Sequence, residues 1–370
     1  MTDQKDSGVA FVGCEFHYHT DKPPIDRNPT TIDYKSPRPI VVNGKRMTTI
    51  DVHAHCAVMD VLPLVEGCPE FDAKKAAPGT DKDPLDDLET RIKDMDAMGI
   101  DVQALSIYLY HHFHWAERDL AAQVTRLQNE KLTEVCEAHP DRFVALGTVS
   151  LQHPDLAAEQ LEFNVKKLGH RGTMIDTSIN GDELSDLKFN PFWAKAEQLE
   201  ALVFIHPSHF AEGVSRLKGK GFLGNIIGNP LNTTIALAHL IYDGTLDCYP
   251  GVKILGAHGG GLLPSYIGRY DHGHNSNDRG GRGDEKKKPS EYLQQIYIDT
   301  LVYNTENLEH LIRECGVSQI VLGTDYPAGM ANLNPIEHLM SVPGLSEDDI
   351  EDICYRTAEK LLKIKFKKRL

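Results

Sequence analysis

The stretch T48-T-I-D-V-H-A-H55 joins a short run of β-branched and apolar residues to two histidines. Residues i and i+2 of a β-strand lie on the same face, so the side chains of His53 and His55 point the same way. The stretch therefore predicts a buried strand whose carboxyl end presents two imidazoles, and both can reach one ion.

Seven later stretches have the same apolar character, and longer amphipathic segments separate them. These stretches begin at Asp101, Phe143, Gly172, Leu202, Val252, Gln295 and Gln319. The intervening segments carry apolar residues at three- and four-residue spacing and mostly end at glycine or proline, which is typical of helices. Eight strand–helix units predict an α/β fold, a closed (β/α)₈ TIM barrel over residues 48–370.

Two segments do not fit this alternation of predicted strands and helices. Residues 1–47 are rich in Pro, Asp, Lys and Thr and predict an extended N-terminal arm, with a hairpin at Asn43-Gly44. Residues 272–289 (HGHNSNDRGGRGDEKKKP) are rich in glycine and charge. They predict an exposed polar loop that is inserted after the sixth strand and a short helix.

The overall composition limits the function classes. Hydrophobic residues make up 41% of the chain. The formal net charge is -15, and this negative charge disfavours broad binding to nucleic acid or to an anionic membrane. No apolar run approaches the roughly 20 residues that span a bilayer, and the first ten residues do not resemble a secretory signal. The seven cysteines form no C-x-x-C pair, which argues against a disulfide framework. We expect a cytoplasmic globular protein.

Residues that can bind a metal follow four of the eight predicted strands. The first strand ends with His53 and His55, the fifth with His206, the sixth with His258 and the eighth with Asp325. The carboxyl ends of all strands of such a barrel meet around one rim, so these side chains are predicted to converge. Imidazole and carboxylate groups are usual ligands of catalytic zinc and also bind manganese. The sequence predicts a catalytic divalent metal site, with zinc expected and manganese as the alternative.

The same segments resemble the signature segments of a known superfamily, the amidohydrolases. The resembling segments are H53-A-H55, H206-P, A257-H258-G-G-G and G323-T-D325-Y-P. Three longer segments narrow the resemblance to the branch that holds α-amino-β-carboxymuconate-ε-semialdehyde decarboxylase and the γ-resorcylate and 5-carboxyvanillate decarboxylases. They are RIKDMDAMGIDVQALS (residues 91–106), PDRFVALGT (residues 140–148) and DGTLDCYPGVKI (residues 243–254).

The resemblance implies a role for each of the five residues. His53, His55, His206 and Asp325 correspond to the metal ligands of the family, and His258 corresponds to its acid/base. Asp325 is a second candidate for supplying the proton. Members with two metals bridge them through a carboxylated lysine on the fourth strand, but the segment that begins at Gly172 contains no lysine there. The resemblance therefore implies one metal.

An arginine extends the resemblance to the substrate. Arg269 lies eleven residues after His258, in G268-R-Y-D-H-G, and matches an arginine that reaches into the neighbouring subunit's site in the semialdehyde decarboxylase. This match implies that Arg269 binds substrate and that the chain forms a homodimer or a higher homo-oligomer. A structural ion pair at the interface is the alternative role for Arg269.

The resemblance implies non-oxidative decarboxylation of a hydroxylated aromatic or ring-cleavage carboxylic acid. The alternative is a hydrolase or hydratase of the same superfamily, because the same ligands support a metal-activated water. Two departures point away from the semialdehyde itself: residues 56–87 contain no arginine, and Ser208 stands where tryptophan is expected. Three histidines after the second strand are candidates for lining the mouth of the pocket, namely His111, His112 and His114.

Overall fold

Eight parallel strands form the central sheet, and each lies at one of the eight stretches that the sequence predicts. Across the sheet they are β4 (Ile50–Cys56), β5 (Val102–Ile107), β6 (Phe143–Gly147), β7 (Gly172–Ile175), β10 (Leu202–Ile205), β11 (Lys253–Gly256), β12 (Ile296–Asp299) and β13 (Ile320–Val321). The structure is a computed structural model that describes residues 9–11, 40–42, 44–71, 85, 87–208, 210, 213–219, 221–276 and 283–365. The strands follow one another across the sheet in chain order, as in a barrel.

Backbone hydrogen bonds between β4 and the segment that follows β13 close the sheet. The amide of Val52 donates to the carbonyl of Leu322 (3.0 Å), and the amide of Asp325 donates to the carbonyl of His53 (2.8 Å). The amide of His55 donates to the carbonyl of Tyr326 (2.7 Å). Closure leaves neither strand with a free edge, and the predicted (β/α)₈ barrel is confirmed.

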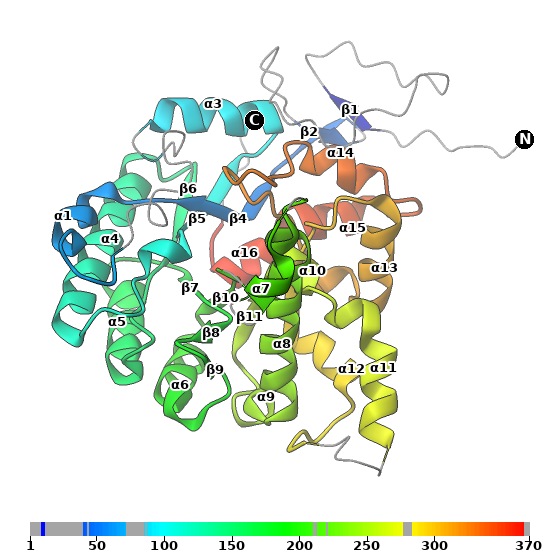
Figure 1. Cartoon of the computed structure of the whole chain (residues 1–370). Helices are drawn as coiled ribbons and strands as arrows, with labels where there is room; N and C mark the ends of the chain where they lie inside the picture. Colours follow the sequence, from blue (N-terminus) through cyan, green and yellow to red (C-terminus); the bar gives the residue numbers. More distant parts are fainter. Residues whose placement is uncertain are drawn as a thin grey trace, which may run out of the picture.

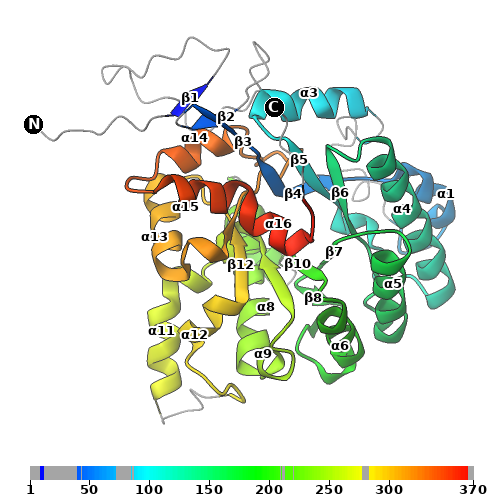
Figure 2. The same cartoon turned by 180° about the vertical axis from the view of Figure 1, so that it is seen from behind.

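Helices surround the strands on the outside (Figure 1, Figure 2). The longer ones are α3 (Leu88–Met98), α4 (Arg118–Ala138), α5 (Pro154–Lys166), α6 (Asn190–Leu199), α8 (Asn229–Tyr242), α11 (Leu263–Asn275) and α13 (Thr305–Cys315). Shorter ones are α1 (Leu62–Val65), α7 (Val214–Leu217), η6 (Gly224–Gly228), α9 (Thr245–Cys248), α10 (Ala257–Gly260), α12 (Pro289–Tyr292), α14 (Pro335–Met340), α15 (Glu347–Glu351) and α16 (Thr357–Leu362). Among the described residues, no helix is both long enough and apolar enough to cross a membrane.

Helix α3 shows how local sequence sets the ends of these helices. The Asp87 side chain accepts a hydrogen bond from the amide of Thr90 (3.0 Å) and so caps the first turn. Gly99 ends the helix with a left-handed φ of 76°, which glycine adopts without strain. The face between these ends buries Met95 and Met98 against the barrel.

The described part of the N-terminal segment confirms the predicted hairpin. Strands β2 (Ile40–Val42) and β3 (Lys45–Met47) pair antiparallel, and Gly44 between them has φ 77°. A third strand, β1 (Val9–Phe11), pairs with β2 and was not expected. The rest of residues 1–39 and Asn43 lie outside the described residues, so the division into an arm and a barrel stays a prediction.

The predicted polar loop at residues 272–289 is shorter than expected. Helix α11 continues to Asn275, and the ring of His274 is buried on it. His274 Nδ1 lies 2.6 Å from the Glu285 carboxylate, which is buried as well. A polar side chain can be buried when a hydrogen-bond partner replaces its water. Composition alone therefore overestimated the exposure of both residues.

Among the glycines that the structure describes, Gly172 leaves the least room for an added side chain. A Cβ atom on it would lie 2.0 Å from the carbonyl oxygen of Leu202 on the neighbouring strand β10. We expect Gly172→Ala to lower the free energy of unfolding by about 1–3 kcal/mol or more, because backbone must move. Chemical denaturation followed by circular dichroism measures this change.

The matched control is Gly268→Ala on the exposed side of α11, where a Cβ meets nothing within 4 Å. A helical glycine is less stable than alanine, so this variant should gain about 0.5–1 kcal/mol. Equal midpoints for Gly172→Ala and the wild type would contradict the strand packing described above.

Candidate metal centre

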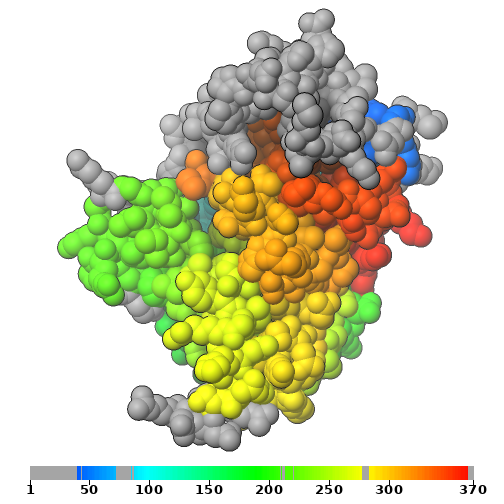
Figure 3. All heavy atoms as spheres, turned by 90° about the vertical axis from the view of Figure 1, so that its right-hand side faces the viewer, coloured from blue at the N-terminus to red at the C-terminus, as the bar shows by residue number. Residues whose placement is uncertain are grey.

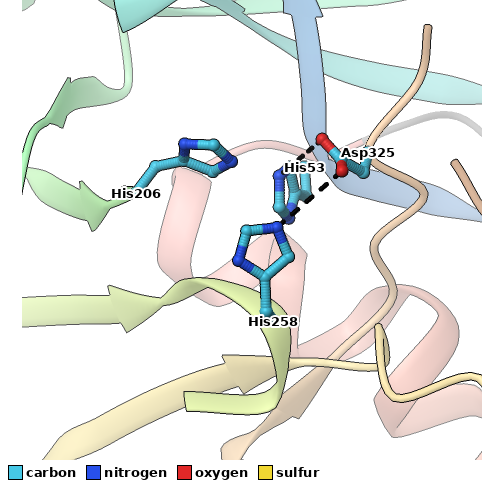
Figure 4. A group of neighbouring side chains, drawn as sticks. All are labelled: His53, His206, His258 and Asp325. Atoms are coloured by element: carbon cyan, nitrogen blue, oxygen red, sulfur yellow. Dashed lines mark ion pairs between the residues drawn. The ribbon is translucent and has the colours of Figure 1, made fainter. Parts of the chain in front are cut away.

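The structure brings all five predicted residues together at the carboxyl ends of the strands. His53, His206, His258 and Asp325 each offer a ligand atom, and these four atoms lie within 4.8 Å of one another (Figure 4). His55 joins them, because its Nε2 atom lies 3.0 Å from His53 Nε2 and 3.1 Å from Asp325 Oδ1. Five side chains from four strands thus form one cluster.

Asp325 is the centre of the ionic contacts in this cluster. Its Oδ1 atom lies 3.2 Å from His53 Nε2, and its Oδ2 atom lies 3.8 Å from His258 Nε2. The residue has a left-handed φ of 60°, an uncommon conformation that aspartate tolerates better than most residues. The backbone bond to the His53 carbonyl holds Asp325 in that position.

A run of residues with positive φ aims His258 at the cluster. His258 has φ 54° and ψ 52°, and the three glycines that follow have φ between 65° and 70°. A Cβ on Gly261 would lie 2.2 Å from the Pro230 carbonyl oxygen, and one on Gly259 would lie 2.5 Å from Val302. The glycines of A257-H258-G-G-G are therefore needed for a sharp turn from strand to helix.

Asp299 is a residue of the site that the sequence analysis missed. It ends β12, is fully buried, and accepts a hydrogen bond from His53 Nδ1 (2.7 Å). It also accepts from the backbone amides of His258 (3.0 Å), Gly259 (2.8 Å) and Leu301 (3.1 Å). A carboxylate on one imidazole nitrogen directs the other nitrogen toward a metal. The sequence did contain a signal for this residue. Asp299 lies at the end of the seventh predicted strand, just as Asp325 lies at the end of the eighth.

A second buried network holds the first strand against its neighbours. Asp51 accepts hydrogen bonds from the Thr324 hydroxyl (2.6 Å) and from Gln103 Nε2 (3.0 Å). The Gln103 side-chain oxygen in turn accepts from Arg91 (2.8 Å), and Arg91 also donates to the His55 carbonyl. Burial raises the pKa of Asp51 to about 6, although its hydrogen bonds oppose the shift. These contacts position the backbone on both sides of His53.

The buried charges divide the imidazoles into two kinds. Burial disfavours a charged His53, but the carboxylates of Asp325 and Asp299 outweigh it and raise its pKa to about 10. Burial lowers the pKa of His55 to about 4 and that of His206 well below its usual value. Burial alone would raise the pKa of Asp325, but the neighbouring histidines hold it well below its usual range. Neutral imidazole and ionised carboxylate are the forms that bind metals.

The unsatisfied atoms of the cluster fit a bound cation. Both ring nitrogens of His206 and the Nδ1 atom of His258 are buried and have no hydrogen-bond partner among the residues that the structure describes. A buried polar atom without a partner is unfavourable. A neutral imidazole has a lone pair on only one of its two nitrogens. A divalent ion that accepts the lone pair of His206 satisfies that nitrogen, so the donor set suits a metal.

Arg269 does not belong to the cluster of its own chain. It is exposed on α11 and has no ion pair or hydrogen bond within the described part of the chain. Figure 3 shows that the yellow and orange segments, which contain α11 and α13, lie side by side on one face of the molecule. The predicted substrate role of Arg269 therefore requires a neighbouring subunit and stays a prediction.

Comparison with known proteins places the chain among the amidohydrolases. The family profile described as "Amidohydrolase" matches residues 50–364. The chain is 30% identical to 2-amino-3-carboxymuconate-6-semialdehyde decarboxylase of Dictyostelium discoideum over 267 residues, which cover 72% of this chain and 74% of that protein. It is 29% identical to gamma-resorcylate decarboxylase of Rhizobium sp. (strain MTP-10005), over 76% of this chain and 88% of that protein.

Solved structures confirm the fold. The 5-carboxyvanillate decarboxylase from Sphingomonas paucimobilis superposes with a TM-score of 0.77 at 23% identity, over 86% of this chain and 100% of that chain. The 5-carboxyvanillate decarboxylase from Novosphingobium aromaticivorans, in complex with manganese and 4-hydroxy-3-methoxy-5-nitrobenzoic acid, superposes with a TM-score of 0.73 at 21% identity, over 86% of this chain and 96% of that chain.

The contacts of Asp299 predict that it controls metal affinity. In Asp299→Asn, the amide group can satisfy His53 or the backbone amides of His258 and Gly259, but it cannot accept from all of them. We expect the affinity for zinc to fall about 10- to 100-fold, as measured by competition with a chromogenic chelator. Asp119→Asn, an exposed carboxylate on α4, is the control, and equal affinities for both variants would refute the role of Asp299.

Proposed function

Because this chain belongs to the amidohydrolase family, we propose that it is a metal-dependent decarboxylase of a hydroxylated aromatic or ring-cleavage carboxylic acid. The observation that carries the proposal is the buried cluster of four histidines and Asp325. The two relatives described above, which align with this chain over most of their length, are decarboxylases of such acids. They support the proposal. The proposed reaction replaces a carboxylate by hydrogen and needs no oxidant.

The proposed ligands are His53, His55, His206 and Asp325, with one divalent ion among them. When bound, the ion supplies a positive charge that holds and polarises the oxygens of a carboxylate and of an adjacent hydroxyl group. Three imidazoles and a single carboxylate favour zinc, whereas manganese prefers sites that are richer in oxygen. The segment after β7 holds Asp176 and no lysine, which supports one ion rather than two.

His258 is the proposed proton carrier. Its side chain is 11% exposed, compared with 0% for His53 and 1% for His55, so it is more accessible to a substrate than these two histidines. The Asp299 carboxylate fixes the backbone amide of His258, which limits the directions that the ring can take. In the reaction, the bond between the ring carbon and the carboxyl carbon breaks and carbon dioxide leaves. The electron pair stays on the ring carbon, which takes a proton from His258.

The proposed assembly is a homodimer in which α11 contributes to the neighbouring site. Leu262, at the start of α11, and Tyr266 are large apolar side chains that are 42% and 57% exposed. With Arg269 they follow the i, i+4, i+7 spacing of one helix face. Exposed apolar side chains next to a charged one are typical of an interface. A guanidinium group on this face suits a substrate carboxylate.

The first prediction of this proposal concerns the products and His258. The zinc-loaded protein should release carbon dioxide from hydroxybenzoates without oxygen, and His258→Ala should keep the metal and lose turnover by about 100-fold or more. His53→Ala should lose both the metal and the activity. Headspace carbon dioxide and metal content per chain are the measurements. Incorporation of labelled solvent oxygen into a product that keeps its carboxylate would instead establish a hydrolase or hydratase.

A second prediction tests the shared site by complementation. Arg269→Ala and His258→Ala should each be inactive alone, since each lacks one part of every site. In a coexpressed mixture, half of the dimers combine both chains, and each such dimer has one complete site. The mixture should therefore recover about a quarter of the wild-type activity. No recovery, with mixed dimers verified by native mass spectrometry, would contradict the proposed role of Arg269 in the partner's site.

A further inference from the structure

His55 differs from His53 in the group that holds its second ring nitrogen. His53 Nδ1 lies 2.7 Å from the buried carboxylate of Asp299, whereas His55 Nδ1 lies 3.2 Å from the hydroxyl oxygen of Ser106. The Nε2 atoms of the two imidazoles lie 3.0 Å apart at the centre of the cluster. A neutral residue therefore stands behind His55 in the place that a carboxylate takes behind His53.

Ser106 is one of two polar residues on β5, and both stand beside a polar residue of β4. All six residues of β5 are buried. In the parallel register of the two strands, Gln103 is the partner of Asp51 and Ser106 is the partner of His55. The side chains of each pair are hydrogen-bonded, at 3.0 Å in the first pair and 3.2 Å in the second. Because a buried polar group is costly unless it has a partner, the residue beside it on β4 accounts for each polar residue of β5.

The hydroxyl group of Ser106 has a second partner, which limits how it can bond to His55. It donates a hydrogen bond to the carbonyl of Ala54 (3.0 Å). A hydroxyl group has one proton to donate and lone pairs that accept. While Ser106 donates to Ala54, it can only accept from His55. The Nδ1 atom of His55 then carries the proton, and its Nε2 atom has the lone pair.

The same two contacts disfavour the opposite tautomer of His55. If Nδ1 had the lone pair, the hydroxyl group of Ser106 could satisfy it only by turning its proton away from the carbonyl of Ala54. That carbonyl would then lose the hydrogen bond, and a buried acceptor without a donor is unfavourable. Ser106 therefore favours the tautomer in which Nε2 of His55 can bind a metal.

Two further contacts fix the direction of the His55 ring. The ring of Tyr108, two residues after Ser106, stacks on it with the centroids 5.1 Å apart and the planes at 26°. At the other nitrogen, Nε2 of His55 lies 3.1 Å from Oδ1 of Asp325. A lone pair and a carboxylate at this distance repel each other unless a cation lies between them. The ring thus spans from Ser106 to the position that the ion would take.

We propose that Ser106 is a positioning residue of the candidate metal centre, which accepts a hydrogen bond from Nδ1 of His55 and so presents Nε2 to the ion. The inference rests on the proposed function, because it takes His55 as a metal ligand. It deepens that function by naming the residue that sets the form of this ligand, and it does not depend on which acid is the substrate.

A hydroxyl group suits this position better than a carboxylate on electrostatic grounds. Asp299 and Asp325 both contact His53, and their two charges already match those of a divalent ion. A third carboxylate behind His55 would be buried in excess of the positive charge, which is costly. The neutral side chain of Ser106 orients the second imidazole without adding a charge.

Zinc affinity tests the role of Ser106. In Ser106→Ala the acceptor is lost, and the affinity should fall about tenfold or more, as measured on the full chain by competition with a chromogenic chelator. Thr173→Val is the matched control. The hydroxyl group of Thr173 is also buried on a strand, but it donates to the carbonyl of Gly147 (2.8 Å) and bonds to no histidine among the described residues. Equal zinc affinities of Ser106→Ala and Thr173→Val would overturn the proposal.

The tautomer of His55 gives a second readout, which a general loosening of the fold would not produce. A histidine that binds a metal through Nε2 keeps an exchangeable proton on Nδ1. At saturating cobalt, the paramagnetic ion separates the proton signals of its ligands from all others, and the Nδ1 signals disappear in deuterium oxide. In Ser106→Ala, one such signal should shift or exchange faster with solvent, while that of His53 stays because Asp299 still holds it. Unchanged signals in Ser106→Ala would refute the proposed hydrogen bond.

Carbon dioxide release by the wild type separates this inference from the proposed function. If no hydroxylated aromatic or ring-cleavage acid releases carbon dioxide but the zinc affinity still falls in Ser106→Ala, decarboxylation is refuted and the role of Ser106 stands. If the wild type releases carbon dioxide while Ser106→Ala binds zinc like the control, the role of Ser106 is refuted and decarboxylation stands.

Discussion

The closure of the barrel between β4 and the segment after β13 is the constraint on which the rest of the site depends. The amide of Asp325 bonds to the carbonyl of His53, and the amide of His55 bonds to the carbonyl of Tyr326. These bonds place the first and the last elements of the candidate metal centre next to each other, although nearly the whole barrel separates them in sequence. His206 and His258 lie at the same rim of the closed barrel, because the carboxyl ends of all its parallel strands meet there.

Buried carboxylates hold this junction and the adjacent strands. Asp51 ties β4 to Gln103 of β5 and to Thr324, while Asp299 ties β12 to His53 and to the backbone of His258. A buried charge is costly unless donors surround it, and each of these carboxylates accepts four hydrogen bonds. An apolar residue could fill the space but could not orient an imidazole. Polar groups whose hydrogen bonds are satisfied therefore support the site.

The distribution of unsatisfied atoms divides the rim into two parts with different chemistry. At the end of β10, the ring of His206 has a lone pair with no partner among the described residues, and this lone pair suits a cation. At the end of β5, the Nδ1 atom of His112 is an acceptor without a hydrogen-bond partner among the described residues, because its Nε2 atom donates to the carbonyl of Ile107.

The sequence by itself determined the eight strands and the five residues at their ends, because apolar runs of strand length are local and a barrel brings their ends to one rim. It also determined the hairpin at Gly44. Only the tertiary structure decided the role of Asp299, the buried pair of His274 and Glu285, and the acceptor character of His112. These features depend on which distant groups meet and which nitrogen carries the proton, and a hydrogen bond between residues far apart leaves no periodic pattern in the sequence.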